Sequence, residues 1–199
     1  MCRPTHSHNR FAVIIMMLLV MSLAGCASAK TTKQATKAFV TYTNTTYGFS
    51  IRYPAGWQHE MNPPSHMAAH PDCDFAIIWS KPVPDGGTLG GLGVLVSRWK
   101  HPLAPAQMKA RRRHMLAALR RDVGRGFPGS PNLRVERVTT ERTSGGLAIL
   151  VHGRNRAARQ LYDQFVLFHA GILYVVTFSG TKDDFATTYR GLPDTFTLR

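Results

Sequence analysis

The sequence lacks the short motifs that mark the common catalytic centres. It contains no Gly-x-Ser-x-Gly nucleophile elbow and no local sequence typical of a catalytic cysteine. The glycine-rich run Gly86–Gly93 lacks the Gly-Lys-Ser/Thr of a phosphate-binding P-loop and leads into a predicted strand. We therefore predict that the protein is not an enzyme and that this run is a loop between strands.

Acidic residues are also scarce. The 199 residues include 25 Lys and Arg but only 11 Asp and Glu, which gives a net charge of +14. A surface with this excess of positive charge attracts anionic partners. Such partners include phospholipid or lipopolysaccharide head groups, acidic proteins, anionic cell-wall polymers and nucleic acid.

A long membrane-spanning run is missing as well. The apolar run from Phe11 to Met21 is shorter than the roughly 20 residues of a transmembrane helix. Basic residues precede it and small residues come after it, in the order of a secretory signal. Residues 23–26, Leu-Ala-Gly-Cys, follow this apolar run and resemble the lipobox of bacterial lipoproteins. The alternative is an ordinary signal peptide, cut near Ala27 and Ala29.

The resemblance to a lipobox implies a cellular location and a covalently attached lipid. Residues 1–25 would be removed as a signal peptide, and Cys26 would become the first residue, thioether-linked to diacylglycerol. The protein would then be lipid-anchored in the cell envelope. Ala27 is not the Asp that retains many lipoproteins at the inner membrane, which favours the periplasmic side of the outer membrane in a bacterium with two membranes. Nucleic acid is the least expected partner of an exported domain.

Cysteine is rare, with three residues in the chain. If Cys2 leaves with the signal and Cys26 carries lipid, Cys73 has no partner within the chain. A single remaining cysteine is either a buried small apolar residue or a free thiol able to pair with another molecule. We expect the buried form.

The residues after the signal divide into a tether and one domain. Positions 26–38 comprise the lipidated Cys and a small, polar stretch without apolar periodicity. A dozen flexible residues span about 20 Å. The lysines of this tether could also lie on an anionic leaflet. Positions 39–199 suffice for a single globular domain with its own core.

Positions 46–57, Thr-Tyr-Gly-Phe-Ser-Ile-Arg-Tyr-Pro-Ala-Gly-Trp, open the domain. Phe49, Ile51 and Tyr53 alternate with polar residues, which predicts a half-buried strand, and Trp57 is expected to fold back into the core. This stretch resembles the opening signature of PsbP-like domains, and the resemblance extends over residues 39–199. It implies an α+β fold, in which an antiparallel sheet of about six strands is flanked by helices as an α/β/α sandwich. Family members of known role are mostly binding modules.

Hydrophobic periodicity places the other elements. Strands are predicted at 75–79, 93–99, 133–139, 147–152, 161–168 and 172–179, with a tight hairpin turn at Gly171. A helix is predicted at 104–123. Its apolar stripe consists of Met108, Met115, Leu116, Leu119 and Val123. Thr181 and Asp184 resemble a capping box for a closing helix that would run to about Arg190.

Two groups of side chains are candidate binding sites. The first lies in the segment His59–Asp74, whose candidate metal ligands are His66, His70, Asp72 and Cys73. His66 and His70 would share a face of a helical turn, and Zn²⁺ accepts His, Cys and carboxylate ligands. Pro63, Pro64 and Pro71 argue against a stable helix there, and the alternative is a solvated loop.

The second group is basic and lies on the predicted helix. Lys109, Arg113, Arg120 and Arg121 are the candidate contacts for an anionic partner, and the alternative is a solvated helix face.

These features support two functional hypotheses. The first is a membrane-anchored envelope lipoprotein that acts as a non-catalytic binding or accessory module for a protein complex or an anionic surface. The second is a lipoprotein that binds a small ligand or metal through the segment His59–Asp74. Apart from the covalent lipid and this metal, no cofactor is expected.

Overall fold

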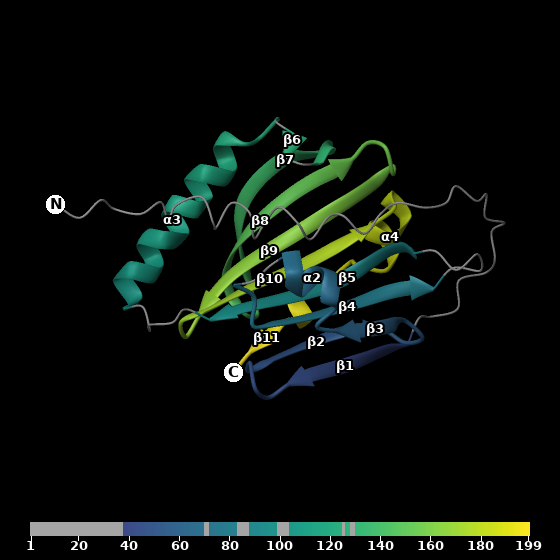
Figure 1. The fold of residues 1–199 in the computed structure, drawn as a ribbon, viewed down its shortest axis with the longest axis horizontal. Coiled ribbons are helices and arrows are strands. Elements are labelled where there is room, and N and C mark those ends of the chain that lie inside the picture. Colours follow the sequence, from purple (N-terminus) through teal and green to yellow (C-terminus); the bar gives the residue numbers. More distant parts are fainter. Residues whose placement is uncertain (1–37, 70–71, 83–87, 99–103, 125, 128–129) are drawn as a thin grey trace.

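The computed structural model describes residues 38–69, 72–82, 88–98, 104–124, 126–127 and 130–199 (Figure 1). The strands are β1 (Phe39–Asn44), β2 (Phe49–Pro54), β3 (Gln58–Met61), β4 (Phe75–Pro82), β5 (Thr88–Arg98), β6 (Gly126–Phe127), β7 (Ser130–Thr143), β8 (Gly146–Asn155), β9 (Gln160–His169), β10 (Ile172–Gly180) and β11 (Thr197–Leu198). The helices are α2 (Pro64–Ala69), α3 (Pro105–Arg121) and α4 (Lys182–Thr187), with a short 3₁₀ turn at Pro193–Thr195.

The strands form two antiparallel sheets. The large sheet has eight strands in the order β3-β4-β5-β10-β9-β8-β7-β6, and the small sheet has three in the order β1-β2-β11. The predicted α+β class is therefore confirmed, and every predicted strand is present. The total exceeds the expected six because short strands extend the edges of the large sheet and because the opening strand lies in a sheet of its own.

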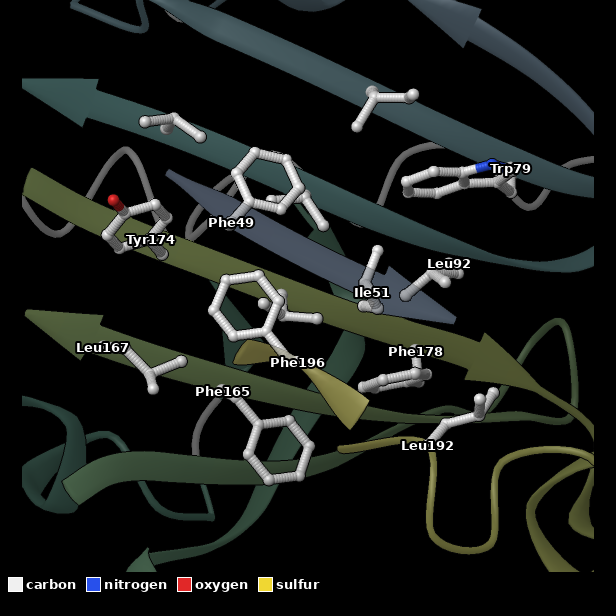
Figure 2. Close-up of a cluster of buried hydrophobic side chains, with 14 of the residues drawn as sticks. Phe49, Ile51, Trp79, Leu92, Phe165, Leu167, Tyr174, Phe178, Leu192 and Phe196 are labelled. Carbon is white, nitrogen blue, oxygen red and sulfur yellow. The ribbon is translucent and has the colours of Figure 1, made fainter. Parts of the chain in front are cut away.

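One face of the large sheet is covered by the small sheet and by the C-terminal segment. Figure 2 shows Phe49 and Ile51 of β2 lying over Leu92, Tyr174 and Phe178 of the large sheet. All five side chains are almost fully buried. We call this cluster, which also includes Trp57 as predicted, the first core.

The opposite face is covered by helices. Met115 and Leu119 of α3 pack over β7 and β8, and they belong to one apolar cluster with alternate residues of other strands, such as Ala76 and Val175, to which α2 adds Met67. We call this the second core. Because successive strand residues point to opposite faces, Ile77 belongs to the first core and Ala76 to the second.

Two local predictions hold in detail. Ala170 (φ 47°) and Gly171 (φ 76°) both have positive φ in the turn between β9 and β10, as a two-residue type I′ hairpin requires. At the start of α4, the Asp184 amide donates to Thr181 Oγ1 at 3.2 Å, and the Thr181 amide donates to Asp184 Oδ2 at 3.0 Å. This reciprocal pair is a capping box.

The glycine-rich run was wrongly predicted as a loop throughout. Its last six residues, Thr88–Gly93, lie in β5, which pairs with β4 and β10. A Cβ at Gly91 would lie 2.7 Å from the carbonyl oxygen of Trp79, and one at Gly90 would lie 2.4 Å from that of Ser179. Glycine is therefore needed because neighbouring backbone approaches too closely for a side chain.

Three helix predictions also need correction. The prolines do not prevent α2, because Pro64 occupies its first position, where a missing N–H costs no hydrogen bond. α4 ends at Thr187 rather than near Arg190. Val123 lies beyond α3 and is 40% exposed, so the apolar stripe ends at Leu119. Within the described residues, no helix has the length and apolar content needed to cross a bilayer.

Candidate functional site

The helix α3 carries the basic candidate residues. Pro105 occupies its first turn, and the side-chain oxygen of Gln107 accepts from the amide of Ala104 at 2.9 Å. Arg120 and Arg121 lie in the last turn, where cations interact favourably with the helix dipole. These local signals explain why the helix forms at this point in the chain.

α3 contacts the sheet through a narrow apolar stripe. Met115 and Leu119 are its buried residues, and Met108 and Leu116 are partly buried. The predicted contact residues are all exposed and have no ion-pair partner within the described part of the chain; they are Lys109, Arg113, Arg120 and Arg121. The helix contains no acidic residue. It therefore presents an uncompensated cationic surface, which we call the α3 cationic face and define by these four residues.

The residues of the segment His59–Asp74 do not share one environment. His66 lies in α2 and is buried, and burial lowers the pKa of its imidazole. Cys73 is also buried, whereas Asp72 is exposed. His70 lies outside the described residues. Among the residues that are described, no group of three His, Cys, Asp or Glu side chains could hold a metal ion. The metal site stays a prediction.

Cys73 has the environment of a structural thiol. Its Sγ donates to the carbonyl oxygens of Phe75 at 3.0 Å and Val96 at 3.3 Å. Burial raises the pKa of the Cys73 thiol more than these hydrogen bonds lower it. The buried form expected from the sequence is the one observed.

A polar row that the sequence analysis missed crosses three strands of the large sheet. His152 on β8 pairs in register with Arg137 on β7 and Asp163 on β9. Arg137 Nη2 lies 2.8 Å from His152 Nε2, and His152 Nδ1 lies 2.6 Å from Asp163 Oδ1. A guanidinium can only donate, so Nε2 accepts and Nδ1–H donates to the carboxylate. This arrangement fixes the Asp163 side chain. We call these three residues the polar row.

The polar row lies on the face of the first core. His152 shares its side of β8 with Ala148 and Leu150, which belong to that core. The sequence indicates the polar row only in that His152 and Asp163 are polar residues within otherwise apolar strands. Only the strand register brings them together, and single-sequence periodicity does not determine register between strands.

Comparison with known proteins identifies the fold. No family model matches the chain, and no curated protein matches it. Among solved structures, the chain is similar to cyanobacterial PsbP (CyanoP) from Synechocystis, with a TM-score of 0.54 and 14% identity over 86% of this chain and 98% of that one. A protein of unknown function from Pseudomonas aeruginosa matches with a TM-score of 0.42 and 14% identity over 81% of this chain and 97% of that one. The chain therefore has a PsbP-like fold.

Proposed function

We propose that this protein is a lipid-anchored, non-catalytic binding module of the cell envelope that docks on an anionic membrane surface through α3. Cys26 would hold it in the membrane, and in a bacterium with two membranes this would be the periplasmic side of the outer membrane. The lipobox-like residues 23–26 support the anchor. The PsbP-like fold is compatible with a binding role but does not identify one.

The observation that carries the proposal is the α3 cationic face. Its four side chains project from one helix that contains no acidic residue. Each Lys or Arg near an anionic leaflet contributes about 1 kcal/mol, so four contribute about 4 kcal/mol at low salt. The attraction falls at physiological ionic strength, where the Debye length is about 8 Å.

Docking through α3 would also orient the domain. Met115 and Leu119 fix the helix against the second core, so its cationic residues face away from the sheet. The first core and the polar row lie on the other face of that sheet. A domain bound through α3 therefore turns the small sheet away from the lipid, where it is accessible to other molecules.

Vesicle binding tests this proposal. The chain from residue 26 onward, with Cys26→Ala to remove the lipid, is sedimented with vesicles containing phosphatidylglycerol or only phosphatidylcholine. We expect binding to the anionic vesicles alone, with a loss at high salt. Changing Lys109, Arg113, Arg120 and Arg121 together to Gln should abolish most of it.

A matched variant separates a specific face from general charge. Arg156, Lys182, Arg190 and Arg199 are exposed, and changing them to Gln removes the same four charges from other parts of the surface. This variant should keep most of its binding. Equal losses in both variants would mean that net charge alone attracts the protein, and the proposal of a docking face would be wrong.

The metal-binding alternative receives no comparable support. His66 and Cys73 are buried, and no metal-binding cluster exists among the described residues. An envelope protein complex as partner is a separate outcome, detectable by crosslinking the anchored protein in cells.

A further inference from the structure

A cavity of about 270 Å³ lies beside the polar row, between the large sheet and the C-terminal segment. Its residues come from β7, β9, β10, α4 and the segment up to Asp194. None comes from α3 or from the segment His59–Asp74. The cavity is therefore independent of both sites predicted from the sequence, and it lies on the face that α3 does not cover.

Aromatic rings form the inner wall of the cavity. Phe165, Phe178 and Tyr189 are nearly fully buried, and Phe185 is partly buried. Consecutive rings meet edge to face, with centroids 5.8 Å apart for Phe165 and Phe178 and 5.4 Å apart for Phe178 and Tyr189. Phe185 and Tyr189 are 5.0 Å apart. These contacts hold the rings in place, so the wall is preformed. The rings give the cavity an apolar wall.

Carboxylates dominate the charge around this wall. Asp163 lines the cavity from β9, and the exposed residues Glu141 and Asp194 lie at its rim. Arg190 is also at the rim. Arg142 contributes to the lining, but it alternates with Glu141 along β7, so its side chain belongs to the opposite face of the strand. The lining residues therefore include three carboxylates and two arginines, one of which points away from the cavity, in a protein whose net charge is +14.

Asp163 is the carboxylate that the polar row holds in place. Its Oδ1 accepts from His152, which is itself held by Arg137. Within the described residues, no hydrogen bond reaches its Oδ2. The polar row therefore positions a carboxylate with one oxygen available, next to the aromatic wall. A protonated amine can bond to such an oxygen and place its apolar part against the rings.

From these features we infer that the cavity binds a small organic cation, a protonated amine with an aromatic or compact apolar group. The cavity, at about 270 Å³, is slightly smaller than the roughly 300–1,000 Å³ typical of drug-sized ligand sites, which favours a small ligand. This binding does not depend on the membrane docking proposed above, because the two sites lie on opposite faces of the large sheet.

Benzylammonium is a suitable probe, because it joins one ring to one cationic amine. The ¹⁵N-labelled chain from residue 26 onward, carrying Cys26→Ala, is titrated and followed by amide chemical shifts. We expect millimolar binding with shifts centred on Thr143, Asp163, Phe185 and Gly191. Benzyl alcohol, a neutral compound of the same shape, and benzoate, an anion, should bind at least about tenfold more weakly.

Substitutions then test the carboxylates. Asp163→Asn keeps an acceptor for His152 but removes the charge, and it should weaken benzylammonium binding about tenfold. Glu141→Gln changes an exposed side chain, and it should weaken binding by a smaller factor. Asp183→Asn, on α4 but outside the cavity, removes one carboxylate elsewhere and should leave binding unchanged.

Several outcomes would overturn the inference. Equal affinity for benzyl alcohol would show an apolar cavity without cation selectivity, and tighter binding of benzoate would show that Arg190 dominates. Absence of shifts at the cavity amides, or equal losses for Glu141→Gln and Asp183→Asn, would also contradict it. None of these outcomes would bear on the proposed membrane docking, because vesicle binding is measured separately and depends on α3.

Discussion

Lys81 Nζ lies 2.9 Å from Asp184 Oδ1 and so joins the end of β4 to the first turn of α4. The other oxygen, Asp184 Oδ2, accepts from the amide of Thr181 at 3.0 Å and from its hydroxyl at 2.8 Å. Asp184 is 5% exposed. One buried carboxylate therefore caps α4 and attaches it to the large sheet.

This arrangement predicts a pH-dependent stability. Burial alone would raise the pKa of Asp184, but the hydrogen bonds from Lys81 and Thr181 outweigh it, and the pKa is lowered from 3.8. A carboxyl with a lowered folded-state pKa stabilises the protein above its unfolded-state pKa, and this contribution is lost as the pH falls through the folded-state value. We expect Asp184→Asn to lower the free energy of unfolding by about 2 kcal/mol at pH 7.

Urea denaturation at pH 7 and at pH 2.5 measures this difference. The effect of Asp184→Asn should be smaller at the acidic pH, because the stabilisation that depends on the carboxylate charge declines once the pH falls below the unfolded-state pKa. Asp183→Asn, an exposed neighbour, is the control and should change stability little at either pH. An Asp184→Asn effect of the same size at both values would show that the charge is not what stabilises the helix.

Gly153 is predicted to be intolerant of a side chain. It pairs with Tyr162 across β8 and β9, and a Cβ at Gly153 would lie 1.9 Å from Tyr162 Cζ. Tyr162 is 1% exposed and its hydroxyl donates to the carbonyl oxygen of Arg134, so the ring has little freedom to move. We expect Gly153→Ala to cost about 2 kcal/mol of stability.

A double-mutant cycle checks the cause. In a Tyr162→Leu background the phenol that occupies the space is gone, so Gly153→Ala should cost less than in the wild type. Thermal or urea unfolding of the wild type, the two single variants and the double variant gives the coupling free energy between Gly153→Ala and Tyr162→Leu. Strict additivity of the two changes would contradict a steric conflict between these residues.

Cys73 is predicted to be unreactive in the folded protein. It is buried, and burial raises the pKa of its thiol, so both access and thiolate content are low. In the chain from residue 26 with Cys26→Ala, Cys73 is the only thiol. Ellman's reagent at pH 8 should label it at least about a hundredfold more slowly in buffer than in urea, because labelling requires opening of the structure. Equally fast labelling in both would contradict its burial.

Lipid attachment is predicted at Cys26. Radiolabelled palmitate should be incorporated into the full-length protein expressed in a bacterium, and the protein should fractionate with membranes. Cys26→Ala should lose both properties, whereas Cys73→Ala should retain them. A membrane-bound Cys26→Ala protein would indicate a different mode of attachment.

The anchored protein also allows a search for partners. In-cell crosslinking followed by mass spectrometry, with Cys26→Ala as control, should recover no stoichiometric protein if the lipid surface itself is the partner. A protein recovered only with the anchored form would instead favour an envelope complex as the docking target.

Local sequence determined most of the secondary structure of this protein. Alternation placed β2 and the central strands, because a half-buried strand repeats every two residues. The capping box at Thr181 and the two-residue turn at Gly171 were readable for the same reason: each depends on contacts between residues at most a few positions apart. The exposed basic residues of α3 also followed from its periodicity.

Tertiary structure decided what depends on pairing between distant segments. The separation of β2 from the large sheet, the burial of Cys73 and the need for glycine at Gly91 arise from neighbours far away in the sequence. The polar row required the register of three strands, since a shift by one residue would turn His152 to the other face. The cavity beside it exists only because the C-terminal segment returns to cover β9 and β10. Sequence periodicity specifies which residues of an element share a face, but contacts between elements are set by how their surfaces pack.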